Sequence, residues 1–386
     1  MPRLASAPLF ALALLLAACG GSGGKATPIA TSTPTIAPIA TPVPTATPGV
    51  HIPTISPTTD ITLPEGFAAY EIASDFKSPT SIARAPDGRI YISEQGGSVY
   101  WIRDADGDGL FEQHVRFASG FKTITGIMVA PDGTLYVSST GRITTVRDTD
   151  ADGVGDDSQV LIDDLPTGRH QNNGLAIGPD GMLYITDGST CDDCNEDDPF
   201  SATILQANID GSGLRVYARG LRNPYDLTFD GQGRLWATDN GSDAPCATID
   251  ELNQIVDGGD YGWPYGDDGC DPYNDGIPPS GDLLLHSAST GIAFYDGAQF
   301  PAAYAGSLFI TLWGGTMRPA AAPALLRATI QEGSGPPLAA TIEEFATGIE
   351  SPIDIAVDRD GTLLVLDYAS ASQATGKLYR LVYTGG

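Results

Sequence analysis

A short pattern of apolar and polar positions recurs along the chain after residue 60. Each copy has an apolar segment, a turn of the Pro-Asp-Gly type and a second apolar segment that usually carries an aromatic residue. Proline presets a turn and glycine accepts positive φ, so each copy predicts a β-hairpin. The copies are residues 85–91, 130–136 and 178–184, with weaker ones at 231–236, 305–309 and 359–364.

The spacing of these copies predicts the fold. The glycine before the second strand returns every 45 to 55 residues, except for one interval of 73 residues. Periods near this length are typical of propeller blades with about four strands each. Six copies therefore predict an all-β fold, a six-bladed β-propeller over residues 61–386. We expect residues 377–383 and 67–72 to share the blade that closes the ring. The alternative is an open sandwich of hairpins.

Composition agrees with this fold and limits the possible partners. The 386 residues include 47 Gly and 29 Pro, which favours many turns over a helical bundle. There are 20 Lys and Arg against 48 Asp and Glu, a net charge of −28. A chain this acidic repels a phosphate backbone and an anionic membrane surface. We expect no nucleic-acid partner, and membrane contact only through an anchor.

The N-terminal residues predict export. A basic start and a short apolar run lead to Leu16-Ala17-Ala18-Cys19. Small residues before a cysteine resemble a bacterial lipoprotein signal over residues 1–19, with Cys19 as the lipidated residue. The alternatives are a plain signal peptide or a buried helix. Residues 20–60 are rich in Thr and Pro, so we expect a disordered stalk. The protein is thus expected to be a lipoprotein at the cell surface or in the periplasm.

Four further cysteines lie in the predicted domain. An even number in an exported protein indicates disulfides. We favour Cys246–Cys270, which closes a long loop, and Cys191–Cys194 as a tight pair; other connectivities remain open. Zinc binding is an alternative, because Cys191-x-x-Cys194 has a spacing that is common among metal ligands. The acidic residues that flank this pair disfavour thiolates, which supports a disulfide.

Two acidic loops predict bound calcium. Residues 104–109 and 148–153 both read D-x-D-x-D-G and begin 44 residues apart, one blade period. Carboxylates at positions one, three, five and nine, with glycine at six, suit the oxygen ligands that Ca²⁺ prefers. The flanks predict strands, so these loops are not EF-hands; the alternative is a solvated acidic turn. The candidate ligands are Asp104, Asp106, Asp108, Glu112, Asp148, Asp150, Asp152 and Asp156.

The predicted propeller also indicates where polar residues meet. Residues just ahead of the inner strands converge near the central axis. Among the four histidines only His170 has such a position; His286 is a weaker candidate, and His114 is expected on the surface. The converging set is Arg169, His170, Asn172, Asn173, Arg222, Asn223, Asp226, Ser289, Thr290, Ser351 and Asp354.

Three stretches together resemble the soluble quinoprotein glucose/sorbosone dehydrogenase family. These are Arg169-His170-Gln171-Asn172-Asn173 through Gly181, Gly220-Leu221-Arg222-Asn223-Pro224 through Leu227, and the segment from Asp250-Glu251 to Trp263-Pro264. Members of that family are six-bladed propellers that use pyrroloquinoline quinone (PQQ). The resemblance covers roughly residues 62–384.

The resemblance implies roles for individual residues. His170 would be the base that takes the hydroxyl proton while hydride passes to the quinone. Arg222 would contact the quinone oxygens, with Asn223 beside it. Histidine and arginine suit these roles. A histidine, whose usual pKa is near neutral, can accept a proton, and a fixed arginine stabilises an oxyanion. The implied reaction is oxidation of an aldose or related sugar, with electrons passed to a quinone or a cytochrome.

The resemblance also implies calcium. Asp250, Glu251 and Tyr261 match positions that hold structural calcium in the family. A second calcium ion, at PQQ, would be held partly by backbone near Gly241.

Two late regions depart from the family pattern. Family members hold the PQQ carboxylates with a lysine and two arginines, but the corresponding regions read Leu312-Trp313-Gly314-Gly315 and Glu350-Ser351-Pro352-Ile353-Asp354. Arg169 also stands where the family has an acidic residue. Arg169, Arg318 and Arg327 are the candidates to replace the missing positive charges.

Two other functions stay open. One is a calcium-dependent hydrolase of the gluconolactonase type, with Asn173 and Asp226 as metal ligands; Glu94 lies on a second strand and is not a convincing axial ligand. The other is a non-catalytic surface propeller that binds glycans or a partner protein, which the missing late basic residues favour.

Overall fold

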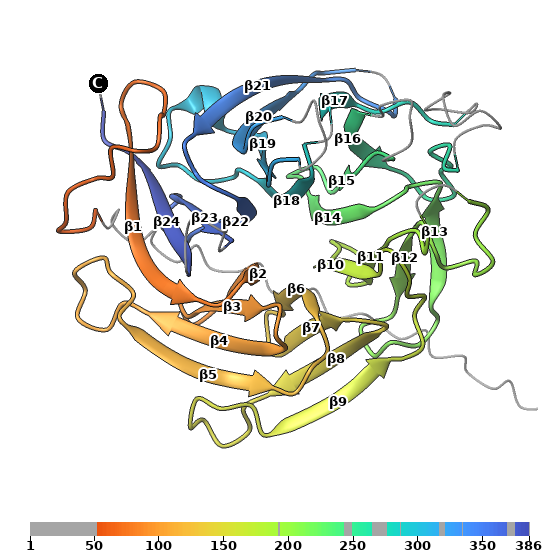
Figure 1. The fold of residues 1–386 in the computed structure, drawn as a ribbon, viewed down its shortest axis with the longest axis horizontal. Coiled ribbons are helices and arrows are strands. Elements are labelled where there is room, and N and C mark those ends of the chain that lie inside the picture. Colours follow the sequence, from red (N-terminus) through yellow and green to blue (C-terminus); the bar gives the residue numbers. More distant parts are fainter. Residues whose placement is uncertain are drawn as a thin grey trace, which may run out of the picture. The chain divides into compact units, whose positions relative to one another are not determined.

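The structure is a computed structural model that describes residues 52–191, 194–242, 249–264, 276–285, 287–315, 321–333, 335–368 and 375–385. The chain divides into residues 1–46 and 47–386, and only the second unit is described below. Its described residues form six four-stranded antiparallel sheets that follow one another around a ring (Figure 1). The predicted six-bladed β-propeller is therefore confirmed.

Each blade runs from an inner strand at the axis to an outer strand at the rim. From inner to outer, blade one contains β2 (Pro79–Arg84), β3 (Ile90–Glu94), β4 (Ser98–Arg103) and β5 (Gln113–Ser119), and blade two contains β6 (Ile124–Val129), β7 (Leu135–Ser139), β8 (Arg142–Arg147) and β9 (Asp157–Ile162). Blade three contains β10 (Asn172–Ile177), β11 (Leu183–Asp187), β12 (Thr203–Ala207) and β13 (Arg215–Arg219), and blade four contains β14 (Pro224–Phe229), β15 (Leu235–Asp239), β16 (Ile249–Ile255) and β17 (Gly281–Leu285). Blade five contains β18 (Ser289–Phe294), β19 (Ser307–Leu312), β20 (Ala324–Ile330) and β21 (Ala340–Thr347), and blade six contains β22 (Pro352–Val357), β23 (Leu363–Asp367), β24 (Gly376–Tyr383) and β1 (Phe67–Phe76).

The repeated hairpins join the first and second strands of each blade. Their turn glycines, such as Gly88 and Gly181, all have positive φ, between 76° and 94°. Glycine is favoured there because it adopts this backbone conformation without steric cost. The second strands, from β3 to β23, are buried along their whole length. Burial on both faces explains why these strands are apolar instead of alternating.

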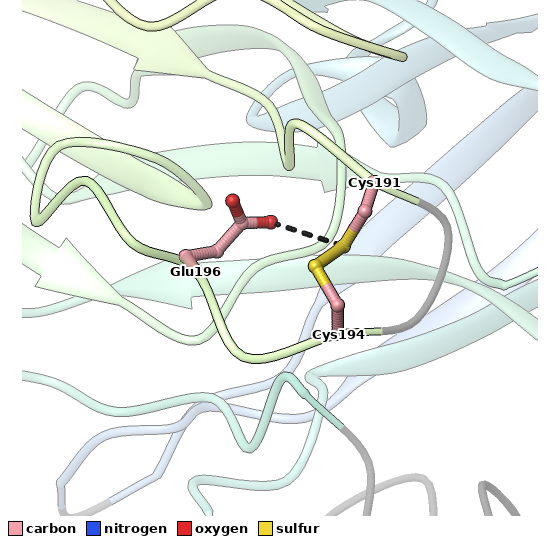
Figure 2. Close-up of side chains that lie close together, drawn as sticks. All are labelled: Cys191, Cys194 and Glu196. Atoms are coloured by element: carbon pink, nitrogen blue, oxygen red, sulfur yellow. Dashed lines mark hydrogen bonds between the residues drawn. A yellow bond between two sulfur atoms is a disulfide. The ribbon is translucent and has the colours of Figure 1, made fainter.

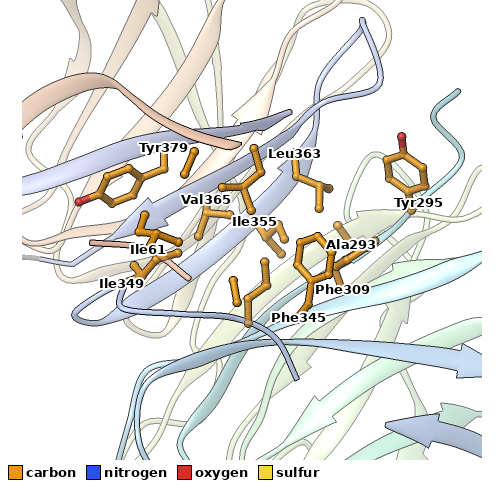
Figure 3. Close-up of a cluster of buried hydrophobic side chains, with 14 of the residues drawn as sticks. Ile61, Ala293, Tyr295, Phe309, Phe345, Ile349, Ile355, Leu363, Val365 and Tyr379 are labelled. Atoms are coloured by element: carbon orange, nitrogen blue, oxygen red, sulfur yellow. The ribbon is translucent and has the colours of Figure 1, made fainter. Parts of the chain in front are cut away.

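The first and last strands close the ring, as predicted. Strand β1 pairs antiparallel with β24, with Phe67 opposite Tyr383 and Tyr70 opposite Arg380. A hydrophobic cluster joins this closing blade to blade five (Figure 3). Within it, the rings of Phe309 and Phe345 meet edge to face at a centroid distance of 4.9 Å. Burial of one such side chain stabilises the fold by about 1.5–3 kcal/mol.

Residues 53–58 of the predicted stalk contact the propeller. Pro53 is buried beside Gly109, and the backbone N–H groups of Thr54 and Thr58 donate to Asp108 O and Ala69 O at 3.1 and 2.8 Å. The chain therefore lies on the propeller from about residue 53, because these residues find apolar and hydrogen-bonding partners there. Cys19 lies outside the described residues. Among the described ones, no helix is long and apolar enough to cross a membrane.

The third residue of each inner strand is serine, glycine or aspartate. Asp226 Oδ2 accepts a hydrogen bond from Ile292 N on the next inner strand at 3.0 Å. Asp354 Oδ2 accepts from Ile82 N at 2.8 Å, which joins β22 to β2. Gly291 leaves room for Asp354, since a Cβ there would lie 2.4 Å from its Oδ1. These contacts tie neighbouring blades together at the axis.

Candidate functional site

His170 lies in the loop just ahead of the inner strand β10. This loop continues the β10–β11 hairpin, because Arg169 N donates to Thr190 O at 2.8 Å and His170 N donates to Ser189 O at 3.1 Å. His170 is half-buried, whereas the Arg169 side chain is exposed. The position of His170 is thus set by the backbone that follows β11.

Arg222 and Asn223 occupy the corresponding place ahead of β14. Their backbone N–H groups donate to Asp239 Oδ2 at 3.0 Å and Oδ1 at 2.7 Å. Asp239 ends the second strand β15, so its carboxylate caps the turn into the inner strand. The Arg222 side chain is only 3% exposed, and its Nη1 donates to Gly241 O at 2.6 Å.

Gly188 and Ser189 bring the two loops together. A Cβ on Gly188 would lie 2.6 Å from His170 Cβ and 2.7 Å from Asn223 Oδ1. Ser189 N donates to Arg222 O at 2.6 Å. The structure therefore brings together the loop of His170 and the loop of Arg222 and Asn223, as expected for neighbouring inner-strand ends. We call these three residues the axial site.

Two buried acids organise the positive charge of the axial site. Asp250 Oδ1 accepts from Gly241 N at 3.1 Å, and its Oδ2 accepts from Ser289 N at 2.8 Å. Since Gly241 O in turn accepts from Arg222, Asp250 and Gly241 hold the guanidinium in place. Burial raises the pKa of Asp239 to about 7, although hydrogen bonds from Asn223 N and Arg222 N and the Arg222 charge act in the opposite direction.

The other converging residues have mainly structural contacts. Asn172 Nδ2 donates to Ser138 Oγ at 2.7 Å, which joins blades three and two. Asn173 Nδ2 donates to Asn223 Oδ1 at 3.2 Å. Asn173 and Asp226, the ligands proposed in the hydrolase alternative, thus each hydrogen-bond to a neighbouring blade.

Glu251 and Tyr261, two of the residues expected to hold structural calcium, have hydrogen-bond partners in the structure. The Tyr261 hydroxyl donates to Gln254 O at 2.6 Å, and Glu251 Oε2 accepts from Asn253 Nδ2 at 3.0 Å. Consecutive residues of a strand point to opposite faces, so Asp250 and Glu251 diverge on β16. Burial raises the pKa of Glu251 to about 8.

Both acidic loops have cage-like geometry. Ligand oxygens of Asp104, Asp106, Asp108 and Glu112 lie within 4.8 Å of one another, as do those of Asp148, Asp150 and Asp152. The sixth-position glycine in each loop donates its N–H to the first aspartate at 2.9 Å. Asp156 instead accepts from Thr149 N and Oγ1 at 2.9 and 2.7 Å. The loops occupy equivalent places in blades one and two.

Calcium removal is expected to lower the melting temperature. A cation bound only by the folded state stabilises it by about 2.7 kcal/mol per site when free calcium is 100 times its Kd. Asp106→Ala and Asp150→Ala should each remove part of the effect of a chelator, and exposed Glu65→Ala should leave it intact. Thermal unfolding with and without a calcium chelator measures this. An unchanged melting temperature on chelation would refute calcium in both loops.

The Cys191–Cys194 disulfide is present, as predicted, with a Cα–Cα distance of 6.1 Å (Figure 2). Its sulfur atoms are bonded to each other, so they are not thiolate ligands for zinc in this state. Cys191 Sγ lies 3.6 Å from Glu196 Oε1. Cys246, Cys270 and His286 fall outside the described residues. His114 is exposed, as expected, and stacks on Phe76.

Two cavities lined by described residues lie away from the axial site. One of about 520 Å³, between blades one and two, is lined in part by Thr140, Arg142 and Asp163. Another of about 430 Å³, between the same blades, is lined in part by Arg89 and Arg147. Neither cavity is lined by His170 or Arg222.

Sequence reasoning missed Asp239, Gly188 and Glu196. A signal for Asp239 exists, because the second strands β11, β15 and β23 all end in aspartate. Asp367 uses its Oδ1 as Asp239 does, accepting from Ser351 N at 2.8 Å. Alignment of the blades to the ends of their second strands would therefore have indicated Asp239.

The residues present fit the quinone end of PQQ. Arg222 supplies a fixed cation, Asn223 an amide and His170 an imidazole. The carboxylate end differs, since described residues 312–315 and 350–354 include no lysine or arginine. Arg327 does not replace them, because it lies on the third strand of blade five and pairs with Glu343 at 2.9 Å. Arg318 lies outside the described residues.

Known proteins resemble this chain in sequence and fold. Over 137 residues it is 31% identical to quinoprotein glucose dehydrogenase B of Acinetobacter calcoaceticus; the match covers 27% of this chain and only 28% of that protein. The PQQ domain of pyranose dehydrogenase from Coprinopsis cinerea, in its holo form, is 15% identical with a TM-score of 0.71, covering 83% of this chain and 97% of that one. PQQ-bound aldose sugar dehydrogenase from Streptomyces coelicolor is 21% identical with a TM-score of 0.62, covering 83% and 100%.

The two structural matches show the propeller fold, and the sequence match confirms the resemblance to quinoprotein sugar dehydrogenases that the motifs predicted. A family described as "Domain of unknown function (DUF7133)" matches residues 58–260, which is more than half of the chain. The chain therefore belongs to the DUF7133 family and is related in sequence to the soluble quinoprotein glucose dehydrogenases.

Proposed function

We propose that the protein oxidises an aldose or a related sugar with PQQ as its cofactor. The observation that carries this proposal is the meeting of His170 and Arg222, whose loops are both hydrogen-bonded to the backbone of Ser189. An imidazole and a buried guanidinium on adjoining loops suit the removal of a hydroxyl proton next to developing negative charge. The named relatives that contain PQQ support the cofactor.

Bound PQQ would supply a quinone that accepts hydride from the sugar carbon. His170 would accept the hydroxyl proton at an imidazole nitrogen, because a neutral imidazole is available near pH 7. Arg222 would hold its charge toward the quinone oxygens, and Asn223 would add an amide donor. The guanidinium is already fixed by Gly241 O, so little reorganisation is needed when charge develops.

The proposed reaction also involves bound calcium, an electron acceptor and attachment to a membrane. Calcium would be bound in the two acidic loops, and electrons would leave to a quinone or a cytochrome. Cys19 would carry a lipid anchor that keeps the exported protein at the membrane surface. The strongly acidic surface would not oppose a neutral sugar substrate.

Arg222→Ala is expected to weaken PQQ binding by about 10- to 100-fold, the effect of losing a hydrogen bond to a charged group. Turnover should fall as well, because the charge acts on the cofactor before and during the reaction. Titration of PQQ by calorimetry, with calcium present, measures the affinity. Arg222→Lys should retain more affinity because it keeps the charge.

Thermal unfolding provides the control for these variants. Burial raises the pKa of Asp239, and the Arg222 charge opposes this rise, so the alanine variant is expected to melt earlier than Arg222→Lys. If folded Arg222→Ala binds PQQ as tightly as the unmodified protein, Arg222 is not a cofactor ligand.

A further inference from the structure

The segment after β11 connects the two loops of the axial site. Ser189 O accepts from His170 N at 3.1 Å, and Ser189 N donates to Arg222 O at 2.6 Å. Thr190 O accepts from Arg169 N at 2.8 Å. Ser189 is completely buried. A shift of the Ser189–Thr190 backbone would therefore displace His170 and Arg222 together.

Glu196 holds this segment through both of its carboxylate oxygens. Oε1 accepts from Thr190 N at 3.1 Å and lies within hydrogen-bond distance of the Ser189 hydroxyl, which also reaches Cys191 O at 2.7 Å. Oε2 accepts from Thr190 Oγ1 at 2.5 Å. Hydrogen bonds to an ionised carboxylate are roughly twice as strong as those between neutral groups. The carboxylate thus links two hydroxyls and one backbone N–H of the same two residues.

The disulfide connects the segment to Glu196 by a short path. Cys191 directly follows Thr190, and Cys194 lies two residues before Glu196. Their bond holds the two Cα atoms 6.1 Å apart, with Cys191 Sγ 3.6 Å from Glu196 Oε1 (Figure 2). Glu196 is consequently kept within reach of Ser189 and Thr190.

We propose that Glu196 is a positioning residue for the axial site. Its carboxylate clamps Ser189 and Thr190, and their backbone fixes the loops of His170 and Arg222. Glu196 acts through these residues and does not touch the substrate. The catalytic consequence rests on the proposed function, whereas the clamp itself can be tested without cofactor.

Glu196→Gln replaces one acceptor oxygen by an NH₂ group, which cannot accept from the hydroxyls or the N–H that face it. The loops should then open more often. We expect amide hydrogen exchange in residues 168–171 to accelerate by about 10- to 100-fold, the effect of losing a hydrogen bond to a charged group. Exchange measured by mass spectrometry on the cofactor-free protein reports this directly.

Asp197→Asn is the matched control. Asp197 is the neighbouring acid, is exposed, and its replacement changes the net charge by the same amount. It should leave exchange in residues 168–171 unchanged. Thr190→Val removes only the Oγ1 bond to Glu196, and it should give a smaller acceleration even if Glu196→Gln fails to fold.

The kinetics of sugar oxidation provide a second test. With PQQ and calcium added, Glu196→Gln should lower kcat more than it raises KM and shift the acidic limb of the kcat pH profile, because the His170 environment changes. Unchanged exchange in both Glu196→Gln and Thr190→Val would overturn the clamp. Faster exchange in a protein that oxidises no sugar would support the clamp and reject the proposed function.

Discussion

His170→Ala is expected to lower sugar turnover by about 100- to 10,000-fold, the range typical for loss of a general base. PQQ affinity should change much less, because the proposed role of His170 is to take a proton from the sugar. The loop around His170 is held by backbone hydrogen bonds to Ser189 and Thr190, which the substitution leaves in place. Dye-linked oxidation of aldoses, measured at saturating PQQ and calcium, gives the turnover.

His114→Ala serves as the control for this experiment. His114 is exposed in blade one, away from the axial site, so its loss should leave turnover unchanged. Added imidazole should partly restore activity to His170→Ala if the missing group is a base. Full activity of folded His170→Ala would assign His170 a structural role in blade three.

The second large effect concerns the pH dependence of stability. Asp354 is buried near the axis, and burial raises its pKa to about 6. Burial and the Asp354 charge also raise the pKa of Asp226. Below about pH 4 Asp354 is protonated in both folded and unfolded chains. Between about pH 4 and pH 6 the unfolded chain ionises Asp354, whereas the folded protein keeps this buried acid protonated. The free energy of unfolding therefore falls as the pH rises through this range, and the stabilisation by protonated Asp354 is lost above pH 6.

Asp354→Asn should therefore flatten the loss of stability on going from pH 4 to pH 8, by about 2 kcal/mol in the free energy of unfolding. Asparagine keeps an acceptor for Ile82 N but does not ionise. Denaturant unfolding of both proteins across this range measures the difference in slope. Equal slopes for the two proteins would show that Asp354 does not carry a raised pKa.

Asp163→Asn is the control for the direction of this effect. Asp163 is an exposed acid whose pKa is lowered, chiefly by a hydrogen bond from Arg142. Its contribution is present at high pH and is lost on acidification, opposite to that of Asp354. Replacement of Asp163 should therefore not flatten the loss of stability toward pH 8.

Much of the fold could be predicted because the hairpin signal is local. A Pro-Asp-Gly turn between two apolar segments, as at residues 130–136, needs no distant partner to be recognised. The repeat then determines the blade count and the pairing of residues 67–72 with 377–383. The placement of Pro53 and Thr54 on the propeller could not be predicted this way, because it depends on contacts with Gly109 and Asp108 on a distant loop.

The meeting of His170 and Arg222 could also be predicted from the repeat. His170 and Arg222 precede inner strands, and strand ends of neighbouring blades must meet near the axis. Glu196 was not predictable, because it lies in a loop after β11 with no counterpart in the repeat. Its contact with Ser189 depends on how that loop folds back. Tyr261 matched a family position, but its hydroxyl is used by Gln254 and Val256.

The most direct test of the proposed function is the absorbance spectrum of the purified protein with PQQ and Ca²⁺, recorded before and after addition of aldoses. We predict that PQQ is retained by the protein through gel filtration and that an aldose converts the bound quinone to its reduced form. The same addition should have no effect on free PQQ at equal concentration. A protein that retains no PQQ, or whose bound PQQ keeps its oxidised spectrum with every aldose, would contradict the assignment as a quinone-dependent sugar dehydrogenase.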